Sequence, residues 1–493
     1  MSLSEISATE IARRIKRRDI SCLEVTEYFV QEQKRWNPKI NAVVENRWSD
    51  ALEDAREKDR ELASVDDPQS LPVLFGVPMT MKEMLQVQGY RSTLGSIHRR
   101  RLVQTRDASV VGRMRQAGVT ILGTTNVPEL GFWFECENPV YGRTVNPFDL
   151  TRTAGGSSGG EAAMIAAGGS PIGLGSDVGG SIRMPAGMCG VFGHKPSNRI
   201  VPITGHYPAS FDVIESLKDP RYPLTCLGPL ARSSEDLWTI MRLLIGPDGL
   251  DQEVKRDFKL GAPVEDWSDA TVWILPEPSM MGVGGTSNTM AQAVRLAGSY
   301  FESLGARVRE MKPDVLRNAA FLWSAGLSEV QGRTFEVALF NEGHANLPVE
   351  IFRSLFGIRN YTMPALMTVV TERLMGANKS EWEGVNAARV AELHAMREKF
   401  NALLRGKNIF ILPTHPREAP KNGSTVRRPL DFAMTGVFNA LGLPATAAPV
   451  SWENDLPQSV QIISAWGQDH MTLSAAQVLE SAFGGSRRPA FPT

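Results

Sequence analysis

The segment GSDVGGSIRMPAG, residues 175–187, surrounds the hydroxyl of Ser181 with glycines that carry no side chain. Glycines at this density fit tight loops that need positive φ angles. They also fit an oxyanion hole, because backbone amides converge on a carbonyl oxygen only where no side chain intervenes. A second segment, AGGSSGGE at residues 154–161, carries Ser157 and Ser158. Taken alone, each segment is compatible with a structural loop or with acyl-transfer chemistry.

Two other kinds of site can be compared with these segments. A phosphate-binding loop needs GxxxxGK[ST] or GxGxxG, and neither segment contains either pattern. Gly155, Ser157 and Gly159 satisfy the G-x-S-x-G pattern of a nucleophile elbow, which is typical of a Ser-His-acid esterase of the α/β-hydrolase class. Such an enzyme needs a histidine after the serine. The candidates, none of which has a distinctive setting, are His194, His206, His344, His394, His415 and His470.

A lysine could replace histidine as the base. Lys82, in GVPMTMKEM, is the only lysine between Lys58 and Lys195, and it follows an apolar run. Its methionine neighbours predict poor solvation, and desolvation disfavours the ammonium form, so the amine could act as a base near neutral pH. A surface lysine at the end of a strand would have the same sequence. No S-x-x-K motif occurs in the chain, so any serine and lysine couple must be assembled across the fold.

The elements that would position these residues change in character along the chain. Residues 1–70 are predicted to form packing helices. Over residues 72–245 short apolar runs alternate with helical stretches, and this alternation predicts an α/β fold with buried strands. Residues 288–405 are predicted to be a mostly helical insertion, and residues 406–485 to return to the core sheet and end in a closing helix. We expect residues 1–493 to form one domain.

Composition and charge exclude several classes of protein. A chain of 493 residues with 42% hydrophobic and 22% charged residues is typical of a globular protein. Its formal net charge of −1 offers no basic field for nucleic acid, and HRRR at residues 98–101 fits a solvated turn. No stretch approaches the roughly 18 to 20 apolar residues of a membrane span. The four cysteines are far apart, and the start of the chain lacks the pattern of a secretory signal, so we expect buried free thiols and a cytoplasmic location.

The run from Gly155 to Pro196, GGSSGGEAAMIAAGGSPIGLGSDVGGSIRMPAGMCGVFGHKP, resembles the signature of the amidase signature family. Further similar stretches are GVPMTMKEM, TTNVPELGF, YGRTVNPFD, GPLARSSEDL and FNALGLPATAAPV. The likeness covers nearly the whole chain and is weakest over about residues 250–400. It implies an α/β fold with a large mixed β-sheet core flanked by helices, and hydrolysis of linear amides without a cofactor or a metal.

The resemblance also implies a role for individual residues. Ser181 matches the nucleophile that forms the acyl-enzyme, Ser157 the bridging serine whose preceding peptide bond is cis, and Lys82 the base. Asp177 and Arg183 flank the nucleophile, and we expect them to be a supporting pair. The backbone amides that match the oxyanion hole are those of Val178, Gly179, Gly180 and Ser181.

Within the family the chain is most similar to the fatty acid amide hydrolase branch, which shares the glutamate after GGSSGG and the sequence GGSP. Gly131 falls where that branch has a substrate-contacting residue, so we expect it to bind substrate together with Ser157 and Ser158. The apolar segment at residues 350–375 fits an acyl pocket or a peripheral membrane contact, and equally helix packing within the insertion or a homodimer contact. The expected substrate is a small-molecule amide with a hydrophobic acyl or aryl group.

Two alternatives remain within this fold. A glutaminase subunit of a tRNA-dependent amidotransferase would act on a small polar amide as part of a complex. The apolar segment and the tryptophan-containing GFWFECENP argue against such a site. A binding protein that has lost catalysis would not need Lys82, Ser157 and Ser181, and all three are present.

Overall fold

The computed structural model describes residues 2–207, 224–328, 335–340, 346–356, 358, 360–376 and 379–492. Its core is a mixed sheet of 11 strands in the order β1-β3-β2-β6-β8-β7-β12-β13-β11-β9-β10, and β4 pairs with β5 in a separate ribbon. The strands are β1 Val43–Asn46, β2 Pro78–Lys82, β3 Thr120–Thr125, β4 Glu137–Asn138, β5 Gly142–Arg143, β6 Ile172–Asp177, β7 Phe192–Lys195, β8 Cys226–Ala231, β9 Thr271–Ile274, β10 Arg307–Glu310, β11 Asn408–Pro413, β12 Ala445–Glu453 and β13 Leu456–Ile463.

The pairing of β2 with β6 determines where the candidate residues meet. β2 pairs in parallel with β3 and with β6, whereas β6 pairs antiparallel with β8. Parallel neighbours end at the same edge of a sheet. Lys82 is the last residue of β2 and Asp177 is the last residue of β6. The base candidate and the loop that carries Ser181 therefore lie at one edge.

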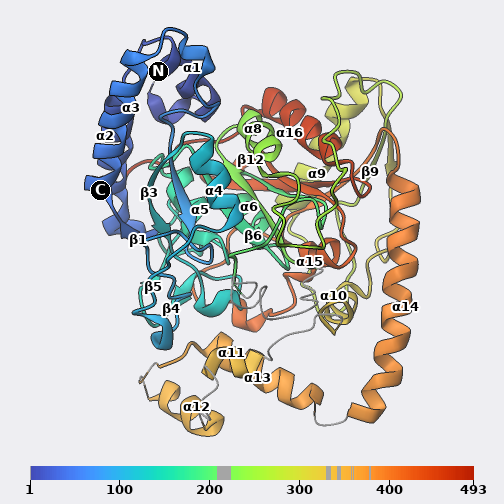
Figure 1. Cartoon of the computed structure of the whole chain (residues 1–493). Helices are drawn as coiled ribbons and strands as arrows, with labels where there is room; N and C mark the ends of the chain where they lie inside the picture. Colours follow the sequence, from blue (N-terminus) through green and yellow to red (C-terminus); the bar gives the residue numbers. More distant parts are fainter. Residues whose placement is uncertain are drawn as a thin grey trace.

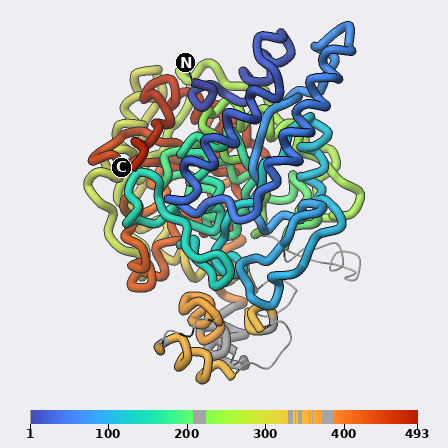
Figure 2. Tube along the Cα trace, turned by 90° about the vertical axis from the view of Figure 1, so that its left-hand side faces the viewer, coloured from blue at the N-terminus to red at the C-terminus, as the bar shows by residue number. Residues whose placement is uncertain are grey.

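Helices cover the sheet on both faces. Figure 1 shows α2 and α3 side by side next to β3 and β1, with α1 above them, and Figure 2 views this layer from its own side. The helices are α1 Ala8–Lys16, α2 Cys22–Ile40, α3 Trp48–Ser64, α4 Ser109–Gln116, α5 Gly159–Ala166, α6 Arg183–Cys189, α8 Ser234–Leu244, α9 Asn288–Ser303, α10 Ala319–Ser328, α11 Phe335–Phe340, α12 Leu347–Leu355, α13 Met363–Gly376, α14 Lys379–Leu404, α15 Ala433–Ala440 and α16 Asp469–Phe483.

Local sequence explains the helices that matter for the site. Helix α2 begins at Ser21, whose side chain accepts from the Glu24 amide while Glu24 reaches back to the Ser21 amide, a capping box. Helix α5 has the sequence GGEAAMIA, and all eight of its residues are buried. Small residues let this helix approach other backbone closely: a Cβ added at Gly160 would lie 2.5 Å from the Asn126 nitrogen. The helix therefore fixes the position of the serines that precede it.

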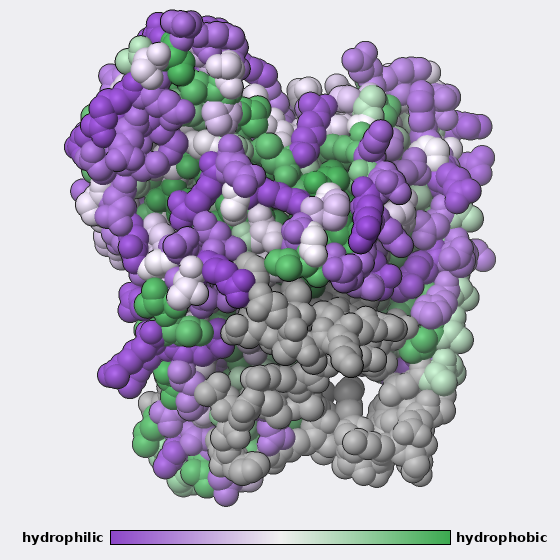
Figure 3. Space-filling model, in the orientation of Figure 1, coloured by the Kyte–Doolittle hydropathy of each residue, from purple (hydrophilic) through white to green (hydrophobic). Residues whose placement is uncertain are grey.

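Helices α11, α12 and α13 gather at one end of the molecule, and α14 runs along its side toward β11 (Figure 1). Two side chains of this end are unusually exposed for their type, Phe352 at 61% and Phe356 at 70%. Figure 3 shows hydrophobic side chains interspersed with hydrophilic ones at this lower end, whereas hydrophilic ones dominate over α1 to α3. The helical segment thus presents apolar surface to solvent.

Candidate active site

Lys82 lies at the centre of the site, and its side chain is fully buried. Its Nζ donates hydrogen bonds to Ser157 Oγ at 2.7 Å and to Ser176 Oγ at 2.8 Å. The Ser176 carbonyl oxygen lies 3.3 Å from the same nitrogen. The amine therefore faces two alcohols inside the protein, which excludes a surface lysine at a strand end.

Burial lowers the pKa of Lys82 from 10.5 to about 7, because desolvation penalises the ammonium form. The nearby charge of Asp177 acts in the opposite direction and offsets only part of this effect on the pKa. Glu161 accepts hydrogen bonds from Thr80 Oγ1 at 2.6 Å and Thr125 Oγ1 at 3.1 Å, and its own burial raises the pKa of the carboxyl to about 8. Near pH 7 a substantial fraction of Lys82 is therefore neutral, as a base must be.

The chain before Ser157 is shaped by two glycines. The peptide bond between Gly156 and Ser157 is cis. Gly155 has φ +81°, and a Cβ there would lie 2.8 Å from Pro185 Cα. A Cβ at Gly156 would lie 2.8 Å from the Trp133 carbonyl oxygen. Side chains at these two positions would push the segment away from its neighbours and displace Ser157 from Lys82.

The loop that carries Ser181 is clamped by a buried ion pair. Asp177 and Arg183 are both fully buried, with 3.0 Å between Oδ1 and Nη2. Arg183 also donates to Asn439 Oδ1 at 2.6 Å and to Gln461 Oε1 at 2.9 Å. Burial alone would raise the pKa of Asp177. The charge and hydrogen bonds of Arg183 outweigh this effect and hold the pKa of Asp177 well below its usual value. Asp177 therefore stays ionised and anchors both ends of the loop.

The backbone amides of this loop are not equivalent. Gly180 N–H donates to Asp177 Oδ1 at 2.7 Å, so it is not available to a substrate. This differs from the expectation that all four amides form the oxyanion hole. Among the described residues, the amides of Val178, Gly179 and Ser181 find no acceptor. Three donors therefore remain beside the nucleophile candidate.

Ser181 and the Ser157 segment are held together through the backbone. The amide of Ser158 donates to the Ser181 carbonyl oxygen at 3.1 Å, and Ser158 Oγ donates to the Ser176 carbonyl oxygen at 3.4 Å. Ser181 is partly exposed, and within the described part of the chain its hydroxyl has no hydrogen-bond partner. It is thus free to contact a substrate, and the link from Ser157 to Ser181 is not formed as a hydrogen bond in this structure.

Histidine does not take part in this arrangement. His194 is buried, 3.2 Å from Asp469 and 2.8 Å from Thr446 through its two ring nitrogens. His415 Nδ1 lies 2.8 Å from the Arg417 carbonyl oxygen. His344 lies outside the described residues. No described histidine bonds to Ser157 or Ser181, so the G-x-S-x-G alternative lacks its base.

Gly131 lies beside Ser157. A Cβ at Gly131 would lie 3.6 Å from Ser157 Oγ and 2.9 Å from Met84 Sδ, and the residue has φ +75°. The next residue, Phe132, packs edge to face on Phe335 of α11 with 4.9 Å between ring centroids. Both belong to or border one apolar cluster, whose buried members are Met84, Leu94, Val127, Leu130, Leu339, Phe340, Leu347, Tyr361, Ala365, Leu366 and Val369. Apolar surface therefore extends from the helical segment to the neighbourhood of Ser157.

Polar contacts anchor the same helical segment. Glu129 Oε2 accepts from the Thr362 amide at 2.7 Å and from its hydroxyl at 3.0 Å. His98 Nε2 lies 2.7 Å from Tyr361 Oη. Within residues 350–375, Tyr361 and Leu366 thus face the core, while the side chain of Leu355 lies outside the described residues. The start of α13 is fixed to the loop that contains Gly131.

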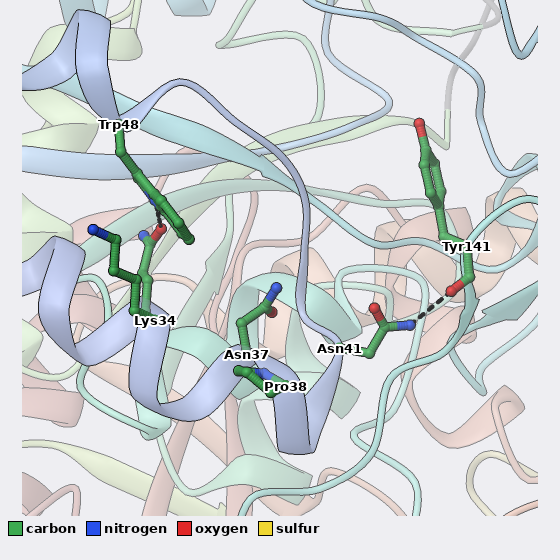
Figure 4. A pocket seen from close by; sticks show the side chains of 7 residues that line it. Lys34, Asn37, Pro38, Asn41, Trp48 and Tyr141 are labelled. Atoms are coloured by element: carbon green, nitrogen blue, oxygen red, sulfur yellow. Dashed lines mark hydrogen bonds between the residues drawn. The ribbon is translucent and has the colours of Figure 1, made fainter.

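A surface pocket of about 550 Å³ lies elsewhere, at the end of α2. Figure 4 shows Lys34, Asn37 and Asn41 from this helix region facing Trp48 and Tyr141. Asn41 Nδ2 donates to the Tyr141 carbonyl oxygen at 2.7 Å. None of its lining residues is a catalytic candidate.

Ser176 is the functional residue that sequence reasoning missed. It lies within β6 and supplies the second hydroxyl partner of Lys82. The available signal was a hydroxyl in a strand otherwise formed by glycine and apolar residues up to Asp177, next to the glycine-rich loop. Placing it opposite Lys82 requires the register between β2 and β6, which pairs Met81 with Leu174.

Other features bear on the predicted class. All four cysteines are free and buried. No described helix is both long enough and apolar enough to cross a bilayer. In the ranges that the structure describes, acidic, histidine and cysteine side chains do not gather in groups of three or more that could hold a metal ion.

Comparison with known proteins gives the family. A family model described as Amidase matches residues 24–473, so the chain belongs to the amidase family and is a hydrolase that acts on amides. The 11-stranded sheet flanked by helices agrees with the fold expected from the resemblance.

Individual relatives span the same length. The chain is 33% identical to fatty-acid amide hydrolase 2 of Homo sapiens, over 97% of this chain and 89% of the relative. It is 31% identical to one of the subunits of the glutamyl-tRNA(Gln) amidotransferase of Thermus thermophilus, over 96% of this chain and 97% of the relative. The solved structure of 6-aminohexanoate cyclic dimer hydrolase complexed with substrate superposes with a TM-score of 0.77 at 26% identity, covering 99% of this chain and 100% of that one.

Proposed function

We propose that the protein is a serine amidohydrolase in which Ser181 is the nucleophile, Ser157 the bridging group and Lys82 the base. The observation that carries this proposal is the buried 2.7 Å contact between Lys82 Nζ and Ser157 Oγ. A serine hydroxyl is a weak nucleophile until a base removes its proton. A lysine with a pKa of about 7 is matched to that task.

The proposed reaction proceeds through an acyl-enzyme. Neutral Lys82 accepts a proton from Ser157 while Ser157 accepts one from Ser181, and Ser181 Oγ bonds to the amide carbon. The Lys82 ammonium then returns the proton through Ser157 to the leaving nitrogen, and the C–N bond breaks. Water attacks the resulting ester by the same relay, which releases the carboxylic acid and restores Ser181.

The amides of Val178, Gly179 and Ser181 are the proposed oxyanion donors. Each donor of this kind typically contributes about 3 to 4 kcal/mol of transition-state stabilisation. We assign Gly180 a positioning role, because its N–H is bonded to Asp177. Asp177 and Arg183 hold the loop, and Ser158 holds the Ser181 carbonyl.

A hydrophobic acyl or aryl amide is the proposed substrate. The support is the apolar cluster that borders Gly131. A Cβ added at Gly131 would lie 3.6 Å from Ser157 Oγ, so an acyl chain in the space next to this glycine would lie beside the relay. We propose Gly131, Ser157 and Ser158 as substrate contacts. The 33% identity to fatty-acid amide hydrolase 2 supports the same class.

Glutaminase activity within an amidotransferase complex is the second candidate, because the amidotransferase relative is 31% identical over nearly the whole chain. That reaction releases ammonia from a small polar amide. The buried members of the cluster around Met84 and Phe132 are apolar apart from the hydroxyl of Tyr361, which favours an apolar substrate over a free α-amino acid, so we rank this function below the first.

Variants and a substrate panel test the proposal. Lys82→Ala and Ser181→Ala should each lower hydrolysis of a medium-chain acyl anilide by about 10⁴-fold, whereas His394→Gln and His470→Gln should stay near wild type. Intact mass after mixing with a slowly hydrolysed anilide should show one acyl group on Ser181. Full activity of Lys82→Ala would refute the assignment of Lys82 as the base. A panel of glutamine, short amides, anilides and long-chain ethanolamides should favour the apolar substrates.

We further propose that the exposed face of α12, with Phe352 and Phe356, contacts a membrane surface peripherally in a cytoplasmic enzyme. The four buried free thiols support a reducing compartment. Co-sedimentation with phosphatidylcholine vesicles should be lost in Phe352→Ser/Phe356→Ser. If sedimentation velocity instead shows a homodimer that the same double variant dissociates, the face is a dimer contact.

A further inference from the structure

The side chain of Trp323 touches the nucleophile loop from a distant part of the sequence. Its indole Nε1 donates to the Val178 carbonyl oxygen at 2.8 Å, across a sequence separation of 145 residues. The ring packs edge to face on Phe432, with 4.7 Å between ring centroids. Both rings lie against Gly179, since a Cβ there would be 3.4 Å from Trp323 Nε1 and 3.3 Å from Phe432 Cδ2. The proposed reaction gives Trp323 no task.

Peptide geometry links this contact to the free amides. A trans peptide is planar, so its C=O and N–H point in opposite directions. The bond from Val178 to Gly179 is trans. Holding the Val178 carbonyl on the indole therefore directs the Gly179 N–H away from Trp323, and that N–H has no acceptor among the described residues.

The following peptide is fixed at both ends. Thr435 Oγ1 donates to the Gly179 carbonyl oxygen at 2.8 Å, and Gly180 N–H donates to Asp177 at 2.7 Å. Glycine has the widest backbone freedom of any residue. Two consecutive peptide planes in this glycine-rich loop are thus set by side chains from α10, from α15 and from the end of β6.

We propose that Trp323 is a positioning residue of the oxyanion hole. Its indole N–H sets the plane of the Val178–Gly179 peptide and thereby aims the Gly179 N–H at the substrate carbonyl oxygen. The inference rests on the proposed function, in which Ser181 attacks that carbonyl. Trp323 acts through the peptide and does not touch the reacting atoms in this role.

Trp323→Phe tests the inference because it keeps an aromatic ring and removes the N–H. We expect kcat for an acyl anilide to fall about tenfold, with KM changed less than twofold. Affinity for a trifluoromethyl ketone, whose adduct with Ser181 places an oxyanion in the hole, should fall by the same factor. Affinity for a non-hydrolysable ketone analogue without the fluorines should not change. Trp466→Phe is the matched control, since that indole also donates to a backbone carbonyl, of Asn198, away from the site.

The outcomes separate this inference from the proposed function. If Trp323→Phe keeps wild-type kcat and trifluoromethyl ketone affinity while Ser181→Ala is inactive, the positioning role is wrong and the proposed function stands. If Ser181→Ala is active, the proposed function itself fails. Equal losses of affinity for both ketones would make Trp323 a pocket residue and overturn the inference. Should Trp323→Phe unfold, Thr435→Val should show the kcat loss that Thr435→Ser avoids.

Discussion

In the proposed mechanism, the buried amine of Lys82 determines the pH dependence of acylation. Only the neutral amine can accept the proton that starts the relay, so kcat/KM should rise with pH as Lys82 loses its proton. With a pKa of about 7, the neutral fraction is about one-tenth at pH 6, half at pH 7 and nine-tenths at pH 8. We therefore expect kcat/KM to rise about tenfold from pH 6 to pH 8 and then to level off.

An unperturbed lysine would behave differently. At its ordinary pKa of 10.5 the neutral fraction would rise about tenfold for each pH unit, and no plateau would be reached below about pH 10. Initial rates with an uncharged acyl anilide, measured from pH 5.5 to pH 10 at constant ionic strength, distinguish the two profiles. A rise that continues through pH 9 would refute the reasoning from burial.

One neighbouring carboxyl could produce a similar profile. Glu83 follows Lys82 directly, and burial raises the pKa of its side chain to about 7. Glu83→Gln keeps an oxygen that can accept from the Thr93 amide, which donates to Glu83 at 2.6 Å. The inflection near pH 7 should persist in this variant if Lys82 is the base. Its disappearance would assign the titration to Glu83.

Three further predictions concern groups around the relay. Ser176→Ala removes one of the two hydroxyl partners of the base and should lower kcat about tenfold, whereas Ser176→Thr should retain activity in the anilide assay. Asp177→Asn leaves Arg183 buried without a counter-ion, so the free energy of unfolding in urea should fall by about 3 to 5 kcal/mol; an unchanged midpoint would contradict this. Gly131→Ala places a Cβ at φ +75° and 3.6 Å from the bridging hydroxyl, so activity should fall at least several-fold without loss of the folded state by circular dichroism.

The elements that the sequence predicts well are those with long apolar runs. β2, β3 and β6 are buried along their whole length, and their runs of apolar and small residues predict strands without any knowledge of their partners. The last two strands of the sheet, β9 and the edge strand β10, are short, and β10 carries polar residues in RVRE, so neither period nor composition distinguishes β10 from loop. β9 pairs with β11 and β10 pairs with β9, and this pairing across the chain decides their structure.

The residues of the candidate site also fall into two groups, those that the sequence indicates and those that only the tertiary structure shows. Lys82, Ser157 and Ser181 stand in motifs that a reader of the sequence can single out, and the structure brings the first two into contact. The hydroxyl of Ser176 stands out in its strand, but its contact with Lys82 depends on strand register. Trp323 carries no local pattern, because its contact is with Val178, 145 residues away in the sequence. Strand register and tertiary packing are not encoded in a short window of sequence.

The ion pair and the hydrogen bonds around the nucleophile loop join two distant parts of the chain. The groups that would react all lie between residues 82 and 181, whereas Asn439, Gln461 and Thr435, which hold Arg183 and Gly179 in place, lie far beyond them. A polypeptide cut off after residue 245 would keep the amine and both alcohols and lose the framework that aims them. We therefore expect that the signature segment alone would not cleave amides, and that activity requires the complete sheet.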